Sequence, residues 1–363
     1  MRALTPLGTN VTLHLPAAGA PRASMATLDP ALEARLNALS CLIGRTPMLV
    51  IRCRVGKTEA RVYAKAEFLN LTGSIKDRMA HRILAGAYAR ADLWPGQPIV
   101  EATSGNAGIA LAALGSALGH PVTIFMPDWM SAERRALLAG YGAEIRLVSR
   151  EEGGFLGAIA QAEAHARRTG AFESRQFSNP DNWRAHFSGT APEVLAQMGG
   201  DGGPPDAFVA GVGTGGTVMG VSRYFATQGF ECAVHPVEPA ESPTLSTGRK
   251  VGRHRIQGVS DEFVPDIVKL GELAPVLAVP DGDAILMAQK LAKELGLGVG
   301  ISSGANMVAA LQAGMSLGWA NPRIATVFCD NSARYLTTDL TREEPVRDHY
   351  LTPRVEILEL KAI

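Results

Sequence analysis

Short apolar runs that suit β-strands alternate along this chain with longer stretches of helical periodicity. The strand-like runs lie at 60–66, 98–102, 121–125, 144–148, 207–210, 232–237 and 323–329. The helical stretches lie at 31–39, 77–89, 108–118, 131–141, 154–169, 218–228 and 283–295. Such alternation predicts an α/β fold in which parallel sheets are covered by helices on both faces.

The length and charge of the chain limit the number of domains and the kinds of binding partner that are expected. The 363 residues are enough for two domains or one large α/β domain, and 46% of them are hydrophobic. Lys plus Arg and Asp plus Glu number 35 each, so no net charge favours a nucleic acid or a membrane surface as partner. The longest apolar run, 108–118, is shorter than the roughly 20 residues of a membrane-spanning helix.

The cysteines and the N-terminal residues carry little chemistry of their own. Cys41, Cys53, Cys232 and Cys329 form no Cys-X-X-Cys pair and no Cys/His cluster. This argues against a metal site or a disulfide framework and favours a reducing cytoplasm. Residues 1–30 are rich in Ala, Pro, Gly and Thr, lack the apolar core of a signal peptide, and are expected to form a flexible extension.

Four predicted loops lead into helices, where open α/β sheets bind their ligands. The lysine loop (70–78) places Lys76 at a helix N-terminus, whose dipole disfavours the protonated amine and so favours Schiff-base chemistry. The hydroxyl loop (101–108) offers Thr103, Ser104 and Asn106 with free N–H groups to a carboxylate. A solvated lysine and an ordinary helix cap are the structural alternatives.

The other two loops are rich in glycine and serine. The glycine loop (211–217) lies between a strand and a helix, and its N–H groups and two threonine hydroxyls suit a phosphate dianion. It has neither the Gly-Lys-Ser/Thr of a P-loop nor the dinucleotide fingerprint, so a smaller phosphate is favoured over a nucleotide. The serine loop (300–306) brings Ser302 to another helix start, where its hydroxyl can bond a ring nitrogen or simply cap the helix.

The order and spacing of these loops match the motifs of one enzyme family. The matching segments are Ile-Gly-Arg-Thr-Pro (43–47), Gly-Ser-Ile-Lys-Asp-Arg (73–78), Thr-Ser-Gly-Asn (103–106), Gln-Phe-Ser-Asn-Pro (176–180), Gly-Thr-Gly-Gly-Thr (213–217) and Gly-Ile-Ser-Ser-Gly (300–304). From about residue 42 to about residue 335 the chain resembles the cysteine synthase branch of the fold-type II pyridoxal 5′-phosphate (PLP) enzymes. That branch includes O-acetylserine sulfhydrylases and cystathionine β-synthases.

The resemblance implies a role for each motif. It implies that Lys76 forms the internal aldimine with PLP, that Asn106 hydrogen-bonds the 3′-oxygen of PLP, and that Ser302 meets its pyridine nitrogen. The residues implied to bind the PLP phosphate are Gly213, Thr214, Gly215, Gly216 and Thr217. The residues implied to bind the substrate are Thr103, Ser104, Asn106, Gln176 and Gly258.

The resemblance also implies a fold and an assembly. It implies two domains, each a mostly parallel twisted sheet flanked by helices, as in the tryptophan synthase β-like enzymes. We expect an N-terminal domain at 31–186, a C-terminal domain at 187–345 and a tail at 346–363, leaving open whether part of 41–66 packs on the other domain. The family usually forms homodimers, and a symmetric pair is expected here.

The implied reaction is β-replacement on a serine-type amino acid through an aminoacrylate intermediate, with Lys76 as the base at the α-carbon. The leading interpretation is cysteine synthesis from O-acetylserine and sulfide. Cystathionine or lanthionine formation, cysteine desulfhydration and O-phosphoserine-dependent synthesis stay open as alternatives. A regulatory binding partner, with a serine acetyltransferase as its target, is the alternative from another class.

Three departures from the family pattern affect the substrates. Ala107 stands where the family often has threonine, and Asn-Leu-Thr-Gly (70–73) replaces Asn-Pro-Gly-Gly. Gly-Val-Ser-Asp-Glu-Phe (258–263) places Asp261 and Glu262 where small neutral residues are usual. We predict that the Asp261 carboxylate faces the entrance of the site and helps to choose or activate a substrate. A solvated loop charge is the alternative.

Overall fold

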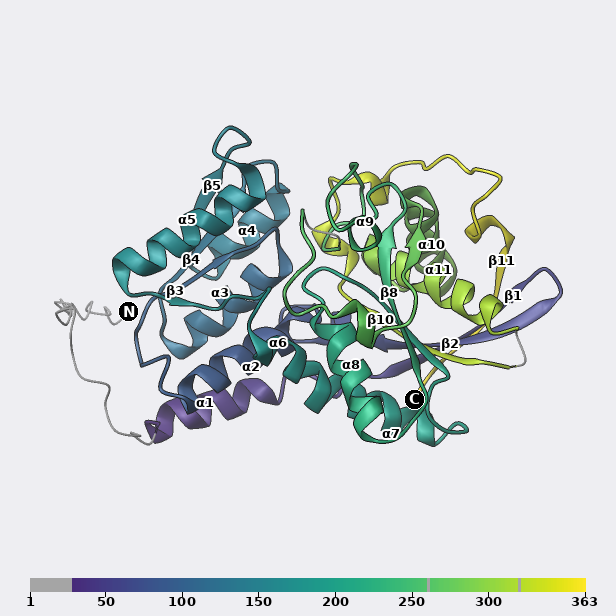
Figure 1. Cartoon of the computed structure of the whole chain (residues 1–363), viewed down its shortest axis with the longest axis horizontal. Helices are drawn as coiled ribbons and strands as arrows, with labels where there is room; N and C mark the ends of the chain where they lie inside the picture. The colour runs from purple at the N-terminus through teal and green to yellow at the C-terminus, as the bar shows by residue number, and fades with distance from the viewer. Residues whose placement is uncertain (1–27, 260–261, 319–320) are drawn as a thin grey trace, which may run out of the picture.

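The computed structural model describes residues 28–259, 262–318 and 321–363, which form two lobes side by side (Figure 1). Most of the expected extension, residues 1–27, lies outside the described residues. No helix in the described part of the chain has the length and apolar character needed to cross a membrane.

The smaller sheet forms the lobe at the left of Figure 1. Within the described residues it has four parallel strands in the order β5–β4–β3–β6. They are β3 (Ile99–Ala102), β4 (Val122–Pro127), β5 (Glu144–Val148) and β6 (Phe172–Glu173). The two central strands, β3 and β4, are buried along their whole length, because helices cover both faces of this sheet.

The helices of this lobe divide between the two faces of the sheet. One face packs on α1 (Pro30–Ser40), α2 (Lys76–Ala89), α3 (Asn106–Leu118) and α4 (Ala132–Gly140). The other face packs on α5 (Gly154–Thr169). Nearly every side chain of α3 is buried, and its Ala and Gly residues allow this close packing.

The larger sheet has seven strands among the described residues, in the order β11–β1–β2–β10–β7–β8–β9. They are β1 (Met48–Val55), β2 (Thr58–Ala66), β7 (Ala207–Gly211), β8 (Ala233–Pro239), β9 (Leu277–Val279), β10 (Arg323–Phe328) and β11 (Val355–Ala362). The strands from β2 to β9 in this order run parallel, whereas β1 is antiparallel to both of its neighbours.

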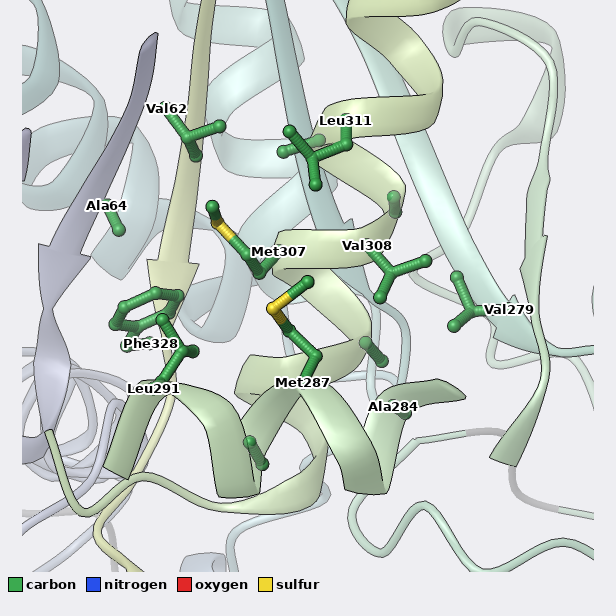
Figure 2. Packing of buried hydrophobic residues seen from close by; sticks show 14 of the residues in the cluster. Val62, Ala64, Val279, Ala284, Met287, Leu291, Met307, Val308, Leu311 and Phe328 are labelled. Carbon is green, nitrogen blue, oxygen red and sulfur yellow. The ribbon is translucent and has the colours of Figure 1, made fainter. Parts of the chain in front are cut away.

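Helices cover both faces of the larger sheet as well. One face packs on α10 (Asp281–Leu295) and α11 (Ile301–Ser316), and Figure 2 shows Met307 of α11 on the side of Val62 and Phe328 of the strands, with Met287 of α10 beside it. The opposite face packs on α6 (Pro180–Ala185), α7 (Ala191–Gly199) and α8 (Gly216–Thr227). The short helix α9 (Thr244–Thr247) follows β8.

The predicted fold class is confirmed: both lobes are mostly parallel sheets flanked by helices. The chain layout adds a detail that the sequence patterns did not indicate. The segment 346–363, expected as a tail, contains β11, and β11 pairs with β1 at the edge of the larger sheet. Through β1 and β2, residues 48–66 join the sheet that is otherwise built from the second half of the chain.

Candidate active site

A cavity of about 350 Å³ opens between the lobes, at the carboxyl ends of β3, β7 and β10. The predicted site residues that line it are Lys76, Thr103, Ser104, Asn106, Gln176, Gly213, Thr214, Thr217, Gly258 and Ser302. Gly215 and Gly216 belong to the same glycine loop without lining the cavity. Asp261 lies outside the described residues, so its predicted place at the entrance stays a prediction.

Lys76 is the first residue of α2 and follows a tightly held turn. The backbone N–H of Ile75 donates to the carbonyl oxygen of Cys329 at 2.9 Å, which ties the turn to the end of β10. The Asp77 carboxyl accepts hydrogen bonds from the N–H of Thr72 at 2.7 Å and from its hydroxyl at 2.6 Å. Burial raises the pKa of Asp77 to about 6. The lysine side chain therefore reaches the cavity from a backbone that is fixed on both sides.

The hydroxyl loop leaves β3 and opens α3. The N–H of Gly105 donates to the Thr103 hydroxyl at 3.1 Å. The Gln176 side chain donates to the carbonyl oxygen of Ala102 at 2.8 Å, and its backbone N–H donates to the Glu101 carboxyl at 3.1 Å. Burial raises the pKa of Glu101 to about 7. These bonds hold Gln176 beside the hydroxyl loop, where both could bind the same carboxylate.

The glycine loop leaves β7 and opens α8, so N–H groups of the first turn of α8 point out of the helix end. Gly215 has φ +82°, a left-handed conformation that glycine adopts without strain. A Cβ atom on Gly213 would clash with the backbone oxygen of Gly258, and one on Gly216 would clash with Asn182. Glycines at these positions therefore let the loop pack tightly against Gly258 and Asn182.

Two neighbours hold the threonines of the glycine loop. Asn182 donates to the Thr214 hydroxyl at 2.8 Å. One ring nitrogen of His186 lies 3.4 Å from the Thr217 hydroxyl, and the other lies 2.9 Å from the Thr190 hydroxyl. Burial lowers the pKa of His186 to about 3, so this ring is neutral. The threonine side chains are therefore oriented by uncharged groups.

A network that sequence patterns did not indicate holds Asn106. Its side-chain nitrogen donates to the Asp330 carboxyl at 2.6 Å, and its side-chain oxygen accepts from Arg334 at 2.5 Å. The Tyr335 hydroxyl donates to the same oxygen of Asp330 at 2.5 Å. Because an amide nitrogen carries two N–H groups, Asn106 keeps a second donor for a ligand in the cavity. Asp330 and Arg334 thus decide which way the Asn106 amide points.

Ser302 lies in the first turn of α11 and lines the cavity with its neighbour Cys329. Burial raises the pKa of the Cys329 thiol to about 12. A thiol that stays protonated is a poor nucleophile, so Cys329 is not expected to act as a nucleophile in this cavity.

Other residues that line the cavity are aromatic or charged. Trp129, Phe155 and Phe177 contribute rings to it. Lys250 and Glu262 also line the cavity and form an ion pair at 2.9 Å. The cavity therefore offers both apolar and charged contacts to whatever enters.

These residues fit PLP. The cavity is lined by one primary amine at a helix start, by part of a glycine loop whose positions 213, 215 and 216 have no room for a Cβ atom, and by a serine hydroxyl at a second helix start. Such groups serve the aldehyde, the phosphate and the ring nitrogen of that cofactor. No group of His, Cys, Asp and Glu side chains that suits a metal ion occurs in the described ranges.

Comparison with known proteins agrees with this geometry. Residues 39–330 match the sequence pattern of the family described as "Pyridoxal-phosphate dependent enzyme". A cysteine synthase of Staphylococcus aureus is 40% identical over 299 residues, which cover 82% of this chain and 95% of that protein. Cysteine synthase 3 of Caenorhabditis elegans is 40% identical over 300 residues, covering 82% of this chain and 88% of that protein.

Solved structures show the same relationship. A hydrogen sulfide-producing enzyme from Fusobacterium nucleatum superposes with a TM-score of 0.88 at 49% identity, covering 91% of this chain and all of that chain. It has also been solved as an Asp-to-Asn variant with an α-aminoacrylate intermediate. Cysteine synthase of Entamoeba histolytica superposes with a TM-score of 0.77 at 31% identity, covering 94% and 97% of the two chains. This chain belongs to the cysteine synthase family of the PLP-dependent enzymes.

Proposed function

We propose that this enzyme replaces a group on the β-carbon of a serine-type amino acid, with sulfide as the group that enters or leaves. One observation carries the proposal. A single cavity gathers Lys76, Ser302, the hydroxyl loop and the glycine loop. Together these groups can hold PLP and the carboxylate of an amino acid against each other.

Each part of the cavity has a distinct task in this proposal. The amine of Lys76 holds the cofactor until the amino acid arrives, then takes the proton from the α-carbon and later returns it. The hydroxyl loop and Gln176 seat the carboxylate so that the Cα–H bond faces that amine. N–H groups of the glycine loop bind the cofactor phosphate. PLP supplies the electron sink that lets the β-substituent depart.

Ser302 biases the outcome of this chemistry. It offers a neutral hydroxyl, where a carboxylate would favour a protonated ring nitrogen. A weaker electron sink shortens the life of charge at the α-carbon, so departure of the β-substituent is favoured over transamination.

Two directions of sulfur transfer are supported by the relatives. Cysteine synthesis from O-acetylserine and sulfide is supported by the Staphylococcus aureus cysteine synthase. Release of sulfide from cysteine is supported by the Fusobacterium nucleatum hydrogen sulfide-producing enzyme, whose identity of 49% is higher than the 40% of that cysteine synthase. We propose both as reactions of the same cavity, since each makes or breaks one bond between sulfur and the β-carbon.

A first experiment tests the lysine. Borohydride reduction of the PLP-loaded protein should leave the cofactor covalently attached to Lys76, as read by peptide mass spectrometry. The variant Lys76→Ala should lose both the attachment and turnover, whereas Lys57→Ala, at an exposed lysine, should keep both. Label on any other lysine would refute the assignment.

A second experiment tests the reaction. O-acetylserine, O-phosphoserine, serine and cysteine are supplied in turn, each alone and with sulfide, thiosulfate, homocysteine or cysteine. Cysteine from O-acetylserine and sulfide, or sulfide from cysteine, is the expected product. If no pair produces or consumes sulfide, the proposed function is wrong.

We further propose that the enzyme works as a homodimer in a reducing cytoplasm. All four cysteines, each among the described residues, are free thiols, which supports that location. Symmetric dimers are the commonest oligomers, which supports the assembly. Light scattering that reports a monomer would contradict the second part.

A further inference from the structure

Arg134 is a buried cation in the cavity wall that the tasks above do not use. It lies on α4, is 4% exposed and lines the cavity. One of its terminal nitrogens donates to the side-chain oxygen of Gln257, and its guanidinium carbon lies 5.2 Å from the ring centroid of Tyr335. Its Nε atom has no hydrogen-bond partner among the described residues, and no carboxylate of that set pairs with it.

Among the residues that the structure describes, the lack of a counter-ion is unusual for a charge buried this deeply. Arg78 is buried to a similar degree, and it pairs with Glu67 at 2.6 Å and with Glu193 at 2.7 Å. Burying a guanidinium without such a partner is expensive, because water is lost and nothing replaces it. An amide oxygen and an aromatic face offset only part of that loss. The arrangement is explained if an anion enters the cavity during function.

The position of Arg134 identifies that anion. A Cβ atom on Gly105 would lie 2.7 Å from Nε and 3.0 Å from Cδ of Arg134, so the side chain packs directly on the backbone of the hydroxyl loop. That loop offers hydroxyl, amide and N–H groups to a carboxylate, and none of them carries a charge. The cofactor phosphate has its own seat at the glycine loop, on the other lobe.

We propose that Arg134 supplies the positive charge that binds the α-carboxylate of the amino-acid substrate on the hydroxyl loop. The inference rests on the proposed function, because that function puts the carboxylate on this loop. A charged donor strengthens a hydrogen-bonded carboxylate site more than neutral donors do. Arg134 is then a substrate-binding residue, and Gly105 is a glycine because any side chain would push the guanidinium off the loop.

The test measures binding without turnover. PLP-loaded protein is titrated with L-alanine, which has no β-leaving group, and with L-alaninamide, which has no carboxylate. The absorbance of the cofactor reports the dissociation constant. Arg134→Gln should weaken L-alanine binding roughly tenfold to hundredfold, as expected for one charged hydrogen-bonding group. The dissociation constant of L-alaninamide should hardly change.

Two further variants complete the design. Arg134→Lys keeps the positive charge but lacks the planar guanidinium. It should therefore weaken the binding of L-alanine less than Arg134→Gln does, and it should leave the binding of L-alaninamide unchanged. Arg135→Gln, at the partly exposed arginine next to it on α4, should bind both ligands like the unmodified protein. If Arg134→Gln fails to fold, as judged by its thermal unfolding, the lysine variant decides by the same comparison.

The proposal is overturned if the Arg134 variants weaken the binding of both ligands equally, since the residue would then only hold α4 against Gln257 and Tyr335. It is also overturned if neither ligand is affected. Because L-alanine cannot undergo β-replacement, this result does not depend on which sulfur reaction the enzyme performs. If the panel of donors and nucleophiles gives no sulfide chemistry while the Arg134 variants still weaken only L-alanine binding, the proposed function is overturned and the role of Arg134 is not.

Discussion

Replacing Gly213 with alanine adds a single methyl group to the glycine loop, which we propose binds the phosphate of PLP. Its Cβ atom would lie well inside the 3.0 Å that such contacts essentially never fall below, and the atom it meets is the backbone oxygen of Gly258. Neither backbone can yield as a flexible side chain would, so the glycine loop or the loop at 258 must move. Overpacking of this kind typically costs about 1–3 kcal/mol. If the strain falls on the phosphate seat, PLP should bind roughly 5- to 150-fold more weakly.

The assay is a dissociation constant for PLP, measured on cofactor-free protein by absorbance or equilibrium dialysis. Gly140→Ala is the matched control, because a methyl group there would meet nothing within 4 Å. The control should bind PLP as the unmodified protein does. Unchanged PLP affinity in Gly213→Ala, or an equal loss in the control, would refute the reasoning that the glycine loop forms the phosphate seat.

Two other predictions concern buried charge. Glu67→Gln should lower the free energy of unfolding by about 3–5 kcal/mol in urea titrations, because it leaves the buried Arg78 guanidinium short of one carboxylate. Glu59→Gln, at an exposed ion pair, should have little effect, and a similar loss in both variants would contradict the argument. His186 has a pKa of about 3 in the folded protein, below its ordinary value, so the unfolded chain binds its proton first as the pH falls. The free energy of unfolding should therefore fall from pH 6.5 toward pH 3 more steeply in the unmodified protein than in His186→Gln, and parallel curves would count against a buried neutral ring.

The four loops of the site could be predicted because each one is a continuous segment of the sequence. A buried strand, a few glycines or hydroxyls and the start of a helix form a local signal, and parallel strands place such loops at one edge of a sheet. The structure brings Lys76, Asn106, Thr214 and Ser302 to one cavity. Local chemistry was therefore enough to find residues that line one cavity, and their contacts with PLP and the substrate stay a prediction.

The groups that hold these residues had no local signal. Asp330 and Arg334 lie 224 and 228 positions from Asn106 and meet it only through the fold. Arg134 reads as one more charged residue on an amphipathic helix, and its burial against Gly105 and Tyr335 depends on how the lobes meet. A charge pattern along one helix cannot distinguish a solvated arginine from a buried one.

The edge of the larger sheet was hidden for a related reason. β11 carries Glu356, Glu359 and Lys361 and buries little apolar surface, so its pattern resembles that of an extended tail. In the structure Glu356 pairs with Arg54 of β1 at 2.9 Å, and Glu359 pairs with Arg52 at 3.2 Å. Pairing at an edge is decided by the neighbouring strand, which a scan of single segments does not include.

Rigid support in this enzyme is concentrated behind Lys76. Arg78 follows two residues later on α2 and forms buried ion pairs with Glu67 and Glu193, and the Glu193 carboxylate also pairs with the buried Lys65 at 2.8 Å. Shifting any member would leave a buried charge unpaired, so this network strongly favours one geometry. In the proposed function the Lys76 amine holds the cofactor and then takes a proton from the α-carbon, and a misplacement of about 1 Å in such a group can slow a reaction on the order of a hundredfold. The buried charges therefore fix the backbone next to Lys76 without lining the cavity themselves.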